Sequence, residues 1–512
     1  MVDGGATPHV EVAIIGAGPA GIATAHLLGK QGVTSMAILE RGADFGGSWR
    51  DNRYPGLAVD IPFPWYQFSF ARSSDWSRVF ATGAEIQAYL TGTARRLGLY
   101  PLLRPGCTVR RQQWDARARM WRLDIEGGPT VTARFLVSAV GGYVDAKEGG
   151  DIPGLDSFAG TVLRPNAWDS SYDTAGKRVA VVGTGSSGVQ IVAALSGTVA
   201  ALDVYQRTPN WILPKTDFRI TAPVRAALRL PGVAAAVHVA GRLAFDLAFL
   251  TPVVHLLPKL PERLLLGAFR AYDAGARQAF RALLRLTVDD QDVRRKLLPR
   301  HGILGKRPVI SSSYLPAFNN PATRLITTPI ECVTPTGIRT TDGVERAADL
   351  IVTAVGYHLW TDPETYRPGT VVGADGFDLA HYYRDHGLHS YAGTAHPRLP
   401  NRWEIVGPYG FVGVGWTDFV ETIAAHVARV IGVAHTRGAT VVEVREEAFD
   451  AWDARMRRAG RTAHLYLGRT HPHVPSYYVN SQGESVYHRP QTITGARRFA
   501  RRSSLADYRF TR

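Results

Sequence analysis

Cysteine is almost absent from this chain. Its 512 residues include only Cys107 and Cys332, and no CxxC pair or Cys/His spacing typical of a bound metal occurs. Two isolated cysteines exclude a disulfide framework, and a disulfide reductase would need a redox-active cysteine pair. Such cysteine usage is typical of a reducing compartment. We therefore expect a cytoplasmic protein without a structural metal.

The N-terminus lacks the features of a secretory signal peptide. No basic segment followed by an apolar run precedes residue 10. The first apolar stretch, residues 10–15, is interpreted as a strand of the fold. We therefore expect no cleaved leader.

Acidic residues are in deficit. There are 44 Asp and Glu against 59 Lys and Arg, which gives a formal net charge of +15 and a pI of about 9.9. Nucleic-acid binding would require basic residues gathered in one stripe, but here they are spread along the chain. We expect no nucleic-acid partner, and we interpret the charge as attraction for phosphorylated cofactors and as solubility.

The length allows several domains of ordinary globular composition. Roughly 150 residues per domain would give two to four domains. Hydrophobic residues make up 45% and charged residues 20% of the chain. The 52 glycines fit a protein whose backbone lies close to its ligands.

A first glycine-rich turn lies near the N-terminus. A short apolar strand is followed by the sequence GAGPAG and then by a helical pattern. Gly16 permits a tight turn, Gly18 lets the backbone approach a pyrophosphate, and Gly21 allows the helix to pack closely on the strand. Glu40 ends the next predicted strand, where a carboxylate accepts hydrogen bonds from ribose hydroxyls and repels a 2′-phosphate. This turn predicts a site for FAD or NAD.

A second turn of the same kind follows about 165 residues later. Its strand ends in Gln206-Arg207-Thr208, without an acid. Arg207 could pair with a 2′-phosphate, and Thr208 could add a hydroxyl donor. The second site is therefore expected to prefer NADPH over NADH. The residues expected at this turn and on its helix are Gly183, Thr184, Gly185, Ser186, Ser187, Gly188 and Gln190.

Two dinucleotide sites predict hydride transfer from NADPH to FAD. The predicted fold class is α/β, with two Rossmann-like dinucleotide-binding domains and a helical insert. We assign the FAD-binding domain to residues 1–142 and 385–512, and the NADPH-binding domain to residues 143–216 and 324–384. The helical insert is assigned to residues 217–323, which are rich in Ala, Leu and Arg.

Two long motifs resemble those of type I Baeyer–Villiger monooxygenases, a family of class B flavoprotein monooxygenases. Residues 46–60, GGSWRDNRYPGLAVD, resemble the element GGxWxxxxYPGxxxD. Residues 158–169, FAGTVLRPNAWD, are similar to the fingerprint FxGxxxHxxxW, with Arg164 in place of its His. In the family that His is thought to act at a distance, through the linker between the domains. The resemblance runs from about Val10 to Tyr508 and is weakest in the helical insert.

The first motif implies residues at the flavin. By resemblance, Gly47 belongs to a rigid loop that contacts FAD, and Trp49 and Tyr54 bring flat surfaces beside the flavin ring. Asp60 would put a negative charge near the catalytic centre and help to bind the cofactor.

Further resemblances concern NADPH and catalysis. Residues 305–308, GKRP, are similar to the family's KRP element. This similarity implies that Lys306 helps to hold the 2′-phosphate and that Arg307 is the active-site arginine, oriented by Asp60. A permanent cation there would stabilise negative charge that develops on oxygen. Tyr477 takes the place of a family Trp that lies over the bound NADP.

Residues 233–257 form the most apolar stretch. They include Arg242, Asp246 and Pro252, and a membrane span needs about 20 apolar residues with few charges. We favour a helix buried in the core. Weak contact with a membrane or an apolar substrate stays open.

These features together predict an FAD- and NADPH-dependent Baeyer–Villiger monooxygenase. It would insert one oxygen atom of O₂ beside a ketone carbonyl to give an ester or lactone. The apolar insert favours a bulky, apolar ketone. Arg164, and Val355 where the related strand has Thr, leave open an N- or S-oxygenating monooxygenase of the same fold. An oxidase-like or redox-sensing protein is the third alternative, and no protein partner is implied.

Overall fold

The first sheet carries the first glycine turn. In the computed structural model, which describes residues 8–149, 151–471, 474 and 476–512, the central strand β1 (His9–Ile15) lies parallel to β2 (Met36–Leu39) and β6 (Val131–Ser138). The apolar run of β1 is buried on both faces, as a central parallel strand requires. The order is β19 (Val371–Val372), β4 (Val109–Asp115), β5 (Met120–Ile125), β6, β1, β2, β3 (Leu103–Arg104), and β20 (Arg402–Glu404) also pairs with β6.

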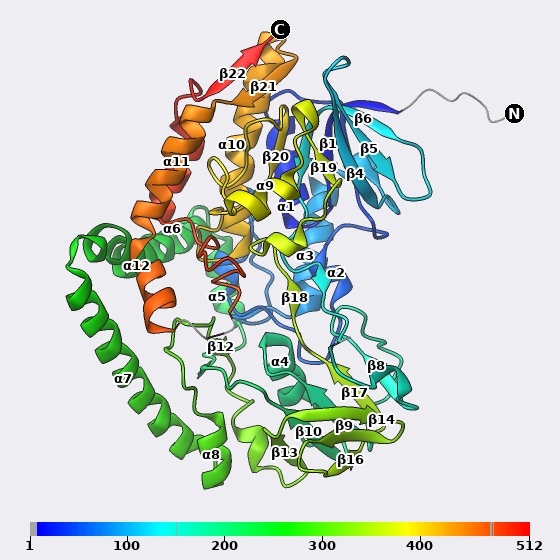
Figure 1. Cartoon of the computed structure of the whole chain (residues 1–512), viewed down its shortest axis with the longest axis vertical. Helices are drawn as coiled ribbons and strands as arrows, with labels where there is room; N and C mark the ends of the chain where they lie inside the picture. The colour runs from blue at the N-terminus through cyan, green and yellow to red at the C-terminus, as the bar shows by residue number, and fades with distance from the viewer. Residues whose placement is uncertain (1–7, 150, 472–473, 475) are drawn as a thin grey trace, which may run out of the picture.

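The second sheet carries the second glycine turn. Its strands are all parallel, and it lies at the opposite end of the long axis from the first sheet (Figure 1). The order is β13 (Thr323–Ile326), β10 (Ala201–Tyr205), β9 (Arg178–Val182), β17 (Leu350–Thr353), β8 (Thr161–Leu163). Each sheet has its own hydrophobic core, so the α/β class with two dinucleotide-binding domains is confirmed.

Helices and short strands complete the two domains. α1 (Pro19–Gly29) and α4 (Ser186–Leu195) follow the two turns, and the largely buried α10 (Trp416–Arg437) packs against α1. The remaining helices of these domains are α2 (Ser48–Asp51), α3 (Gly83–Arg96), α9 (Leu379–His386), α11 (Glu446–Ala459), α12 (Arg461–Leu465) and α13 (Ile493–Arg502). The remaining strands are β7 (Asp145–Ala146), β11 (Ile212–Leu213), β12 (Val309–Ile310), β14 (Ile330–Thr334), β15 (Gly337–Thr340), β16 (Glu345–Ala347), β18 (Tyr357–His358), β21 (Val441–Val444) and β22 (Tyr508–Thr511).

The helical insert lies along one side of the molecule, away from β4, β5 and β6 (Figure 1). It comprises α5 (Ala222–Arg229), α6 (Val233–Phe245), α7 (Glu262–Thr287) and α8 (Gln291–Leu297). The helical stretch that begins with α6 runs on to Lys259, and only 11% of its most apolar window is buried. The interpretation of residues 233–257 as buried core is therefore wrong, because within this described segment only His238 and Asp246 are buried.

The structure places two segments differently from the predicted domain boundaries. β19 pairs with β4 of the first sheet, although residues 371–372 were assigned to the NADPH-binding domain. β12 pairs with β11, and Val309 and Phe318 pack in the core of the second domain. Residues 309–318 were assigned to the insert, but they pack with the second domain.

The loop between α2 and α3 packs directly on α4. Gly56 has φ +80°, and a Cβ at this position would lie 2.8 Å from the carbonyl oxygen of Gln190. The Tyr54 hydroxyl donates to Gln190 Oε1 at 3.0 Å, and Gln190 Nε2 donates to the Ala58 carbonyl at 2.9 Å. A loop from the first domain is thus joined to the helix that opens the second nucleotide site.

Replacing Gly56 with Ala should loosen this contact. Gly176 is a matched control, because it also has a positive φ, +68°, but has open space around its Cβ position. Alanine at either site costs about 1–2 kcal/mol in backbone strain, and only Gly56→Ala adds a collision with α4. We expect a larger drop in the thermal midpoint for Gly56→Ala and a raised KM for NADPH. Equal drops and unchanged KM values in both variants would contradict the contact.

Candidate active site

A cavity of about 990 Å³ extends between the two glycine turns. It is lined by residues from both domains and from the loop after the insert, which brings together most of the residues predicted for the site. Those that line it are Gly16, Gly18, Glu40, Gly47, Trp49, Tyr54, Asp60, Gly185, Ser186, Ser187, Gln190, Arg207, Lys306, Arg307 and Tyr477.

Five predicted residues are not part of the lining in the described chain. Gly21 and Gly188 lie against the carbonyl groups of Gly16 and Gly183, where a Cβ would collide with backbone. They allow each helix to approach its strand, as expected. Thr184 is buried and its carbonyl accepts from Asn210 Nδ2 at 3.1 Å. The five are Gly21, Gly183, Thr184, Gly188 and Thr208.

Glu40 is held at the first turn by three donors. Its carboxylate accepts from the backbone N–H groups of Ala17 and Gly42, each at 2.7 Å, and from Arg50 at 3.0 Å. The residue is only 4% exposed. A carboxylate has about four acceptor positions, so one remains for a ribose hydroxyl. The turn and this carboxylate therefore fit the adenosine half of a dinucleotide.

Arg50 was not predicted from the sequence. Burial alone would lower the pKa of its guanidinium, but the charges of Glu40 and Asp51 outweigh burial and raise it. The distance from Arg50 Nη2 to Asp51 Oδ1 is 2.8 Å. Arg50 stands four positions before Tyr54 inside the recognised motif, and this position is its only sequence signal.

The second turn opens on the cavity beside two cations. A Cβ on Gly185 would meet no atom within 4 Å, so this face of the turn leaves room for a ligand. Burial lowers the pKa of the Lys306 ammonium, and the charge of Arg207 lowers it further. No described carboxylate offsets either effect. Two neighbouring cations at the end of a nucleotide-binding turn fit a phosphate between them.

Arg307 and Asp60 form an ion pair at the centre of the cavity. Arg307 Nη2 lies 2.5 Å from Asp60 Oδ2, and about a third of the arginine side chain is exposed. Burial works against the charged guanidinium, but Asp60 and then the nearby Tyr477 and Tyr143 raise the pKa of Arg307 well above its usual value. The guanidinium therefore stays protonated at any working pH.

Aromatic side chains form the wall of the cavity next to this pair. The ring of Tyr143 contacts those of Trp416 and Tyr477, with centroids 5.8 and 6.5 Å away. The Trp49 indole donates to the Tyr66 hydroxyl at 3.0 Å. Tyr477 lies in the cavity wall, and its predicted position over the bound NADP stays a prediction, whereas Tyr54 packs in the core of the second domain. The position of Tyr54 favours a role in joining the domains over a flat contact with the flavin.

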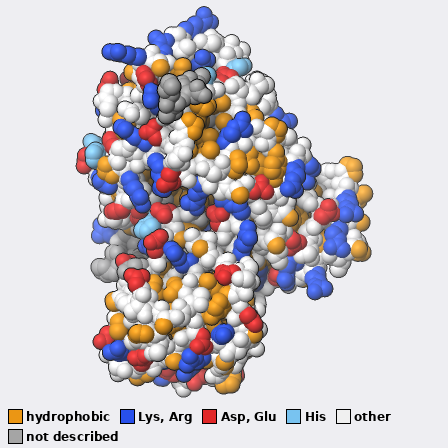
Figure 2. Space-filling model, turned by 90° about the vertical axis from the view of Figure 1, so that its right-hand side faces the viewer, with side chains coloured by type: hydrophobic (Ala, Val, Ile, Leu, Met, Phe, Trp, Pro, Cys, Tyr) orange, Lys and Arg blue, Asp and Glu red, His pale blue; other side chains and the backbone are white. Residues whose placement is uncertain are grey.

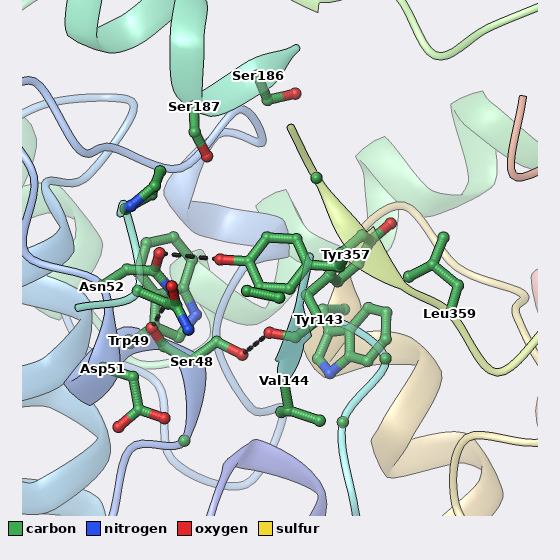
Figure 3. A pocket seen from close by; sticks show the side chains of 18 of the residues that line it. Ser48, Trp49, Asp51, Asn52, Tyr143, Val144, Ser186, Ser187, Tyr357 and Leu359 are labelled. Atoms are coloured by element: carbon green, nitrogen blue, oxygen red, sulfur yellow. Dashed lines mark hydrogen bonds between the residues drawn. The ribbon is translucent and has the colours of Figure 1, made fainter. Parts of the chain in front are cut away.

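Two tyrosines in the wall were missed by the sequence analysis. In Figure 3, Tyr357 points toward Asn52, to which its hydroxyl donates at 3.0 Å, and Ser48 donates to the carbonyl of Tyr143 at 2.9 Å. Tyr143 follows β6 and Tyr357 follows β17. Ligands of open parallel sheets bind beyond the carboxyl ends of the strands, and this rule could have identified both residues.

Arg164, which replaces the fingerprint His, lies in the cavity lining. Its guanidinium is 3.4 Å from the Glu148 carboxylate, and both side chains are largely exposed. We expected this position to act through the linker between the domains. The structure gives it direct access to a ligand in the cavity.

The backbone before Lys306 is anchored by a buried carboxylate on α7. Asp273 accepts from Tyr466 at 2.7 Å, from His471 Nε2 at 3.0 Å and from the Ile303 N–H at 3.2 Å. The Leu304 N–H donates to the Tyr466 hydroxyl at 3.2 Å. Burial would raise the pKa of Asp273, but hydrogen bonds from His471 and Tyr466 lower it. The insert thus fixes the loop that leads to the two cationic site residues.

The substitution Asp273→Asn should displace that loop. It keeps the size of the side chain but removes the charge that accepts three hydrogen bonds, which costs about 2 kcal/mol of stability. We expect a several-fold rise in the KM for NADPH with a smaller change in kcat. Asp292→Asn on α8 is the control, because its ion pairs are exposed and worth little. An unchanged KM in Asp273→Asn would show that the loop does not need this anchor.

Known proteins share this arrangement. Residues 14–82 match the model of an NAD(P)-binding Rossmann-like domain. A Baeyer–Villiger monooxygenase of Streptomyces coelicolor is 34% identical over 511 residues, which cover 98% of this chain and 93% of that protein. The chain belongs to the Baeyer–Villiger monooxygenase family. The family membership predicted from the sequence is thereby confirmed.

Two further relatives bear on the chemistry. The solved structure of a steroid monooxygenase bound to NADP is 26% identical, with a TM-score of 0.82, and the match covers 98% of this chain and 99% of that one. A phenazine N-monooxygenase of Lysobacter antibioticus is 29% identical, and the match covers 89% of this chain and 88% of that protein. The enzyme is an NADPH-dependent flavoprotein monooxygenase with FAD as its cofactor.

Proposed function

We propose that the enzyme inserts one oxygen atom of O₂ beside the carbonyl of a bulky, apolar ketone and releases an ester or lactone. The second oxygen atom leaves as water, with NADPH as the electron donor. The observation that carries this proposal is the Arg307–Asp60 pair, which lies in an aromatic-walled cavity between two nucleotide-binding turns. We place the reaction in the cytoplasm, where the two free cysteines would stay reduced.

The two turns would hold the cofactors. Gly16, Gly18 and Glu40 would bind the adenosine and pyrophosphate of FAD, and Gly47 with Trp49 would border its ring. Gly185 and the serines that follow it would bind the pyrophosphate of NADPH. Bound FAD, reduced by NADPH, supplies the activation of oxygen.

Arg307 would stabilise the reacting oxygen. Its guanidinium is permanently charged, and it lies in a partly buried site where a charge acts more strongly than in water. The Asp60 carboxylate fixes the orientation of the guanidinium and leaves its other N–H groups free to donate. Negative charge that develops on oxygen during attack on a carbonyl would meet a preorganised cation.

The wall of the cavity supports an apolar substrate. Tyr143, Trp416, Tyr477 and Phe411 line it near Arg307. Flat aromatic surfaces favour fused or cyclic carbon skeletons over small polar carbonyl compounds. The similarity to a steroid monooxygenase points in the same direction.

Lys306→Ala should test the NADPH site. Removal of one of two cations that face the 2′-phosphate should raise the KM for NADPH about tenfold or more. The KM for NADH should stay almost unchanged, because NADH lacks this phosphate. Lys177→Ala, at an exposed position outside the cavity, is the control. Equal losses with NADPH and NADH would argue for a general folding defect.

Arg307→Ala should test the oxygenation reaction. Loss of a charge that stabilises the transition state should lower kcat for ketone oxygenation about a hundredfold or more. NADPH should still reduce the flavin, so hydrogen peroxide should replace the ester. Products are measured by mass spectrometry with a panel of ketones, amines and sulfides. Arg300→Ala, outside the cavity lining, serves as the control.

The same panel separates the second candidate function. N- or S-oxygenation is favoured by the similarity to a phenazine N-monooxygenase and by Arg164 in place of the fingerprint His. Such a reaction would add oxygen only to amines or sulfides, and Arg307→Ala would retain it. That outcome would overturn the Baeyer–Villiger proposal.

A further inference from the structure

The exposed side of the helical stretch Val233–Lys259 carries apolar side chains. By length and composition this stretch could cross a membrane, with a mean hydropathy of 1.6 over its most apolar window. Leu247 is 70% exposed and Leu256 57%. A helix on the surface of a soluble protein usually turns polar residues outward. We call the exposed set the apolar face: Val237, Val239, Leu243, Leu247, Phe249 and Leu256.

The opposite side of the same stretch is tied to the protein by polar contacts. His238 Nδ1 lies 2.7 Å from the carbonyl oxygen of Pro64, and Gly241 lies against the Trp65 ring. Buried Asp246 accepts from the backbone N–H groups of Ile493 and Thr494, at 2.6 and 2.8 Å. Crossing a bilayer would break these contacts and put Asp246 into hydrocarbon. The stretch can therefore lie on a membrane but cannot span one in this fold.

Cations border the apolar face. Lys259 and Arg263 are exposed at its C-terminal end. The basic helix α13 lies against the stretch, because its first residues donate to Asp246, and its Arg498, Arg501 and Arg502 are exposed. Within the stretch, Asp246 is the only acidic residue and it is buried. A partner for this surface must combine an apolar layer with negative charge.

We propose that the apolar face inserts into the surface of an anionic lipid bilayer. A helix with one anchored side, one apolar side and a basic border has the features of an interfacial helix. Each Lys or Arg near an anionic surface adds attraction that salt weakens. The formal net charge of +15 favours approach to such a surface. Figure 2 shows the side of the molecule that lies to the right in Figure 1, away from the helical insert, where Lys and Arg side chains are mixed with Asp and Glu.

The helical stretch Val233–Lys259 lies close to the active-site cavity, which links the proposed bilayer contact to the reaction. It packs against Pro64 and Trp65, and the neighbouring residues Ile61 and Tyr66 line the active-site cavity. Only this helix and the segment of Pro64 and Trp65 would thus separate a bilayer on the apolar face from the residues that line the cavity. Apolar molecules that partition into lipid would be concentrated beside the site.

Flotation with lipid vesicles tests the proposal on the FAD-loaded enzyme. We expect the enzyme to float with vesicles of phosphatidylcholine and phosphatidylglycerol, and less with phosphatidylcholine alone. The double variant Leu243→Glu/Leu247→Glu should lose at least about tenfold in vesicle partitioning. Leu286→Glu is the matched control, because Leu286 is 84% exposed on α7, outside the apolar face. NADPH oxidation and the thermal midpoint report whether each variant is folded.

A second variant tests the charges and does not disturb the helix. Lys259→Gln/Arg263→Gln should weaken binding to the anionic vesicles severalfold, and added salt should remove the difference between this variant and the wild type. Absence of flotation by the wild type, or equal flotation by the Leu243→Glu/Leu247→Glu and Leu286→Glu variants, would overturn the proposal. Light scattering distinguishes a second copy as occupant: a dimer that Leu247→Glu dissociates, without vesicle binding, would also overturn it.

Discussion

The close approach of Gly56 to the backbone of α4 is the constraint on which the site depends. It sets the separation between the two nucleotide-binding turns, because Gln190 is part of the same helix that begins at the second turn. Two hydrogen bonds of the Gln190 side chain, one accepted from the Tyr54 hydroxyl and one donated to the Ala58 carbonyl, stabilise the contact between the loop and α4. The cavity lies where two sheets with separate hydrophobic cores are joined at backbone distance. Hydride transfer between two bound dinucleotides requires such fixed geometry.

The cavity has a different charge at each of its parts: negative at the first turn, positive beside the second turn, and an ion pair at Arg307 and Asp60. The first turn presents a carboxylate, Glu40, already held by Arg50 and two amides. Beside the second turn lie Arg207 and Lys306, and the charge of Arg207 adds to burial in lowering the pKa of Lys306. The centre holds a neutral pair, Arg307 with Asp60. In a chain with net charge +15, the sign of the charge at each turn is thus set by local side chains and not by the overall charge.

The parts of the fold that depend on local backbone rules were predictable from the sequence. Gly16, Gly183 and their neighbours follow from what a tight strand–turn–helix connection requires, and Arg307 with Asp60 followed from resemblance. Tyr143 and Tyr357 each follow a parallel strand, which is a sequence signal, but that the two sheets meet at one cavity is a tertiary feature that no local pattern carries. Asp273 was missed for the same reason, since its partners lie about 30 and 200 residues away in the sequence. The outward orientation of Leu247 was missed because composition does not tell which face of an apolar helix is covered.

The anchor at Asp273 has a consequence for how distant parts of the enzyme influence one another. The same insert carries the apolar face and, through Asp273, holds the loop that leads to Lys306 and Arg307. Any coupling between binding at the apolar face and binding at this loop is reciprocal. If adsorption of the insert changes the affinity for NADPH by some factor, NADPH changes the affinity of the insert for its surface by the same factor. The loop before Lys306 would then couple the binding of NADPH to the binding of the enzyme at a membrane surface.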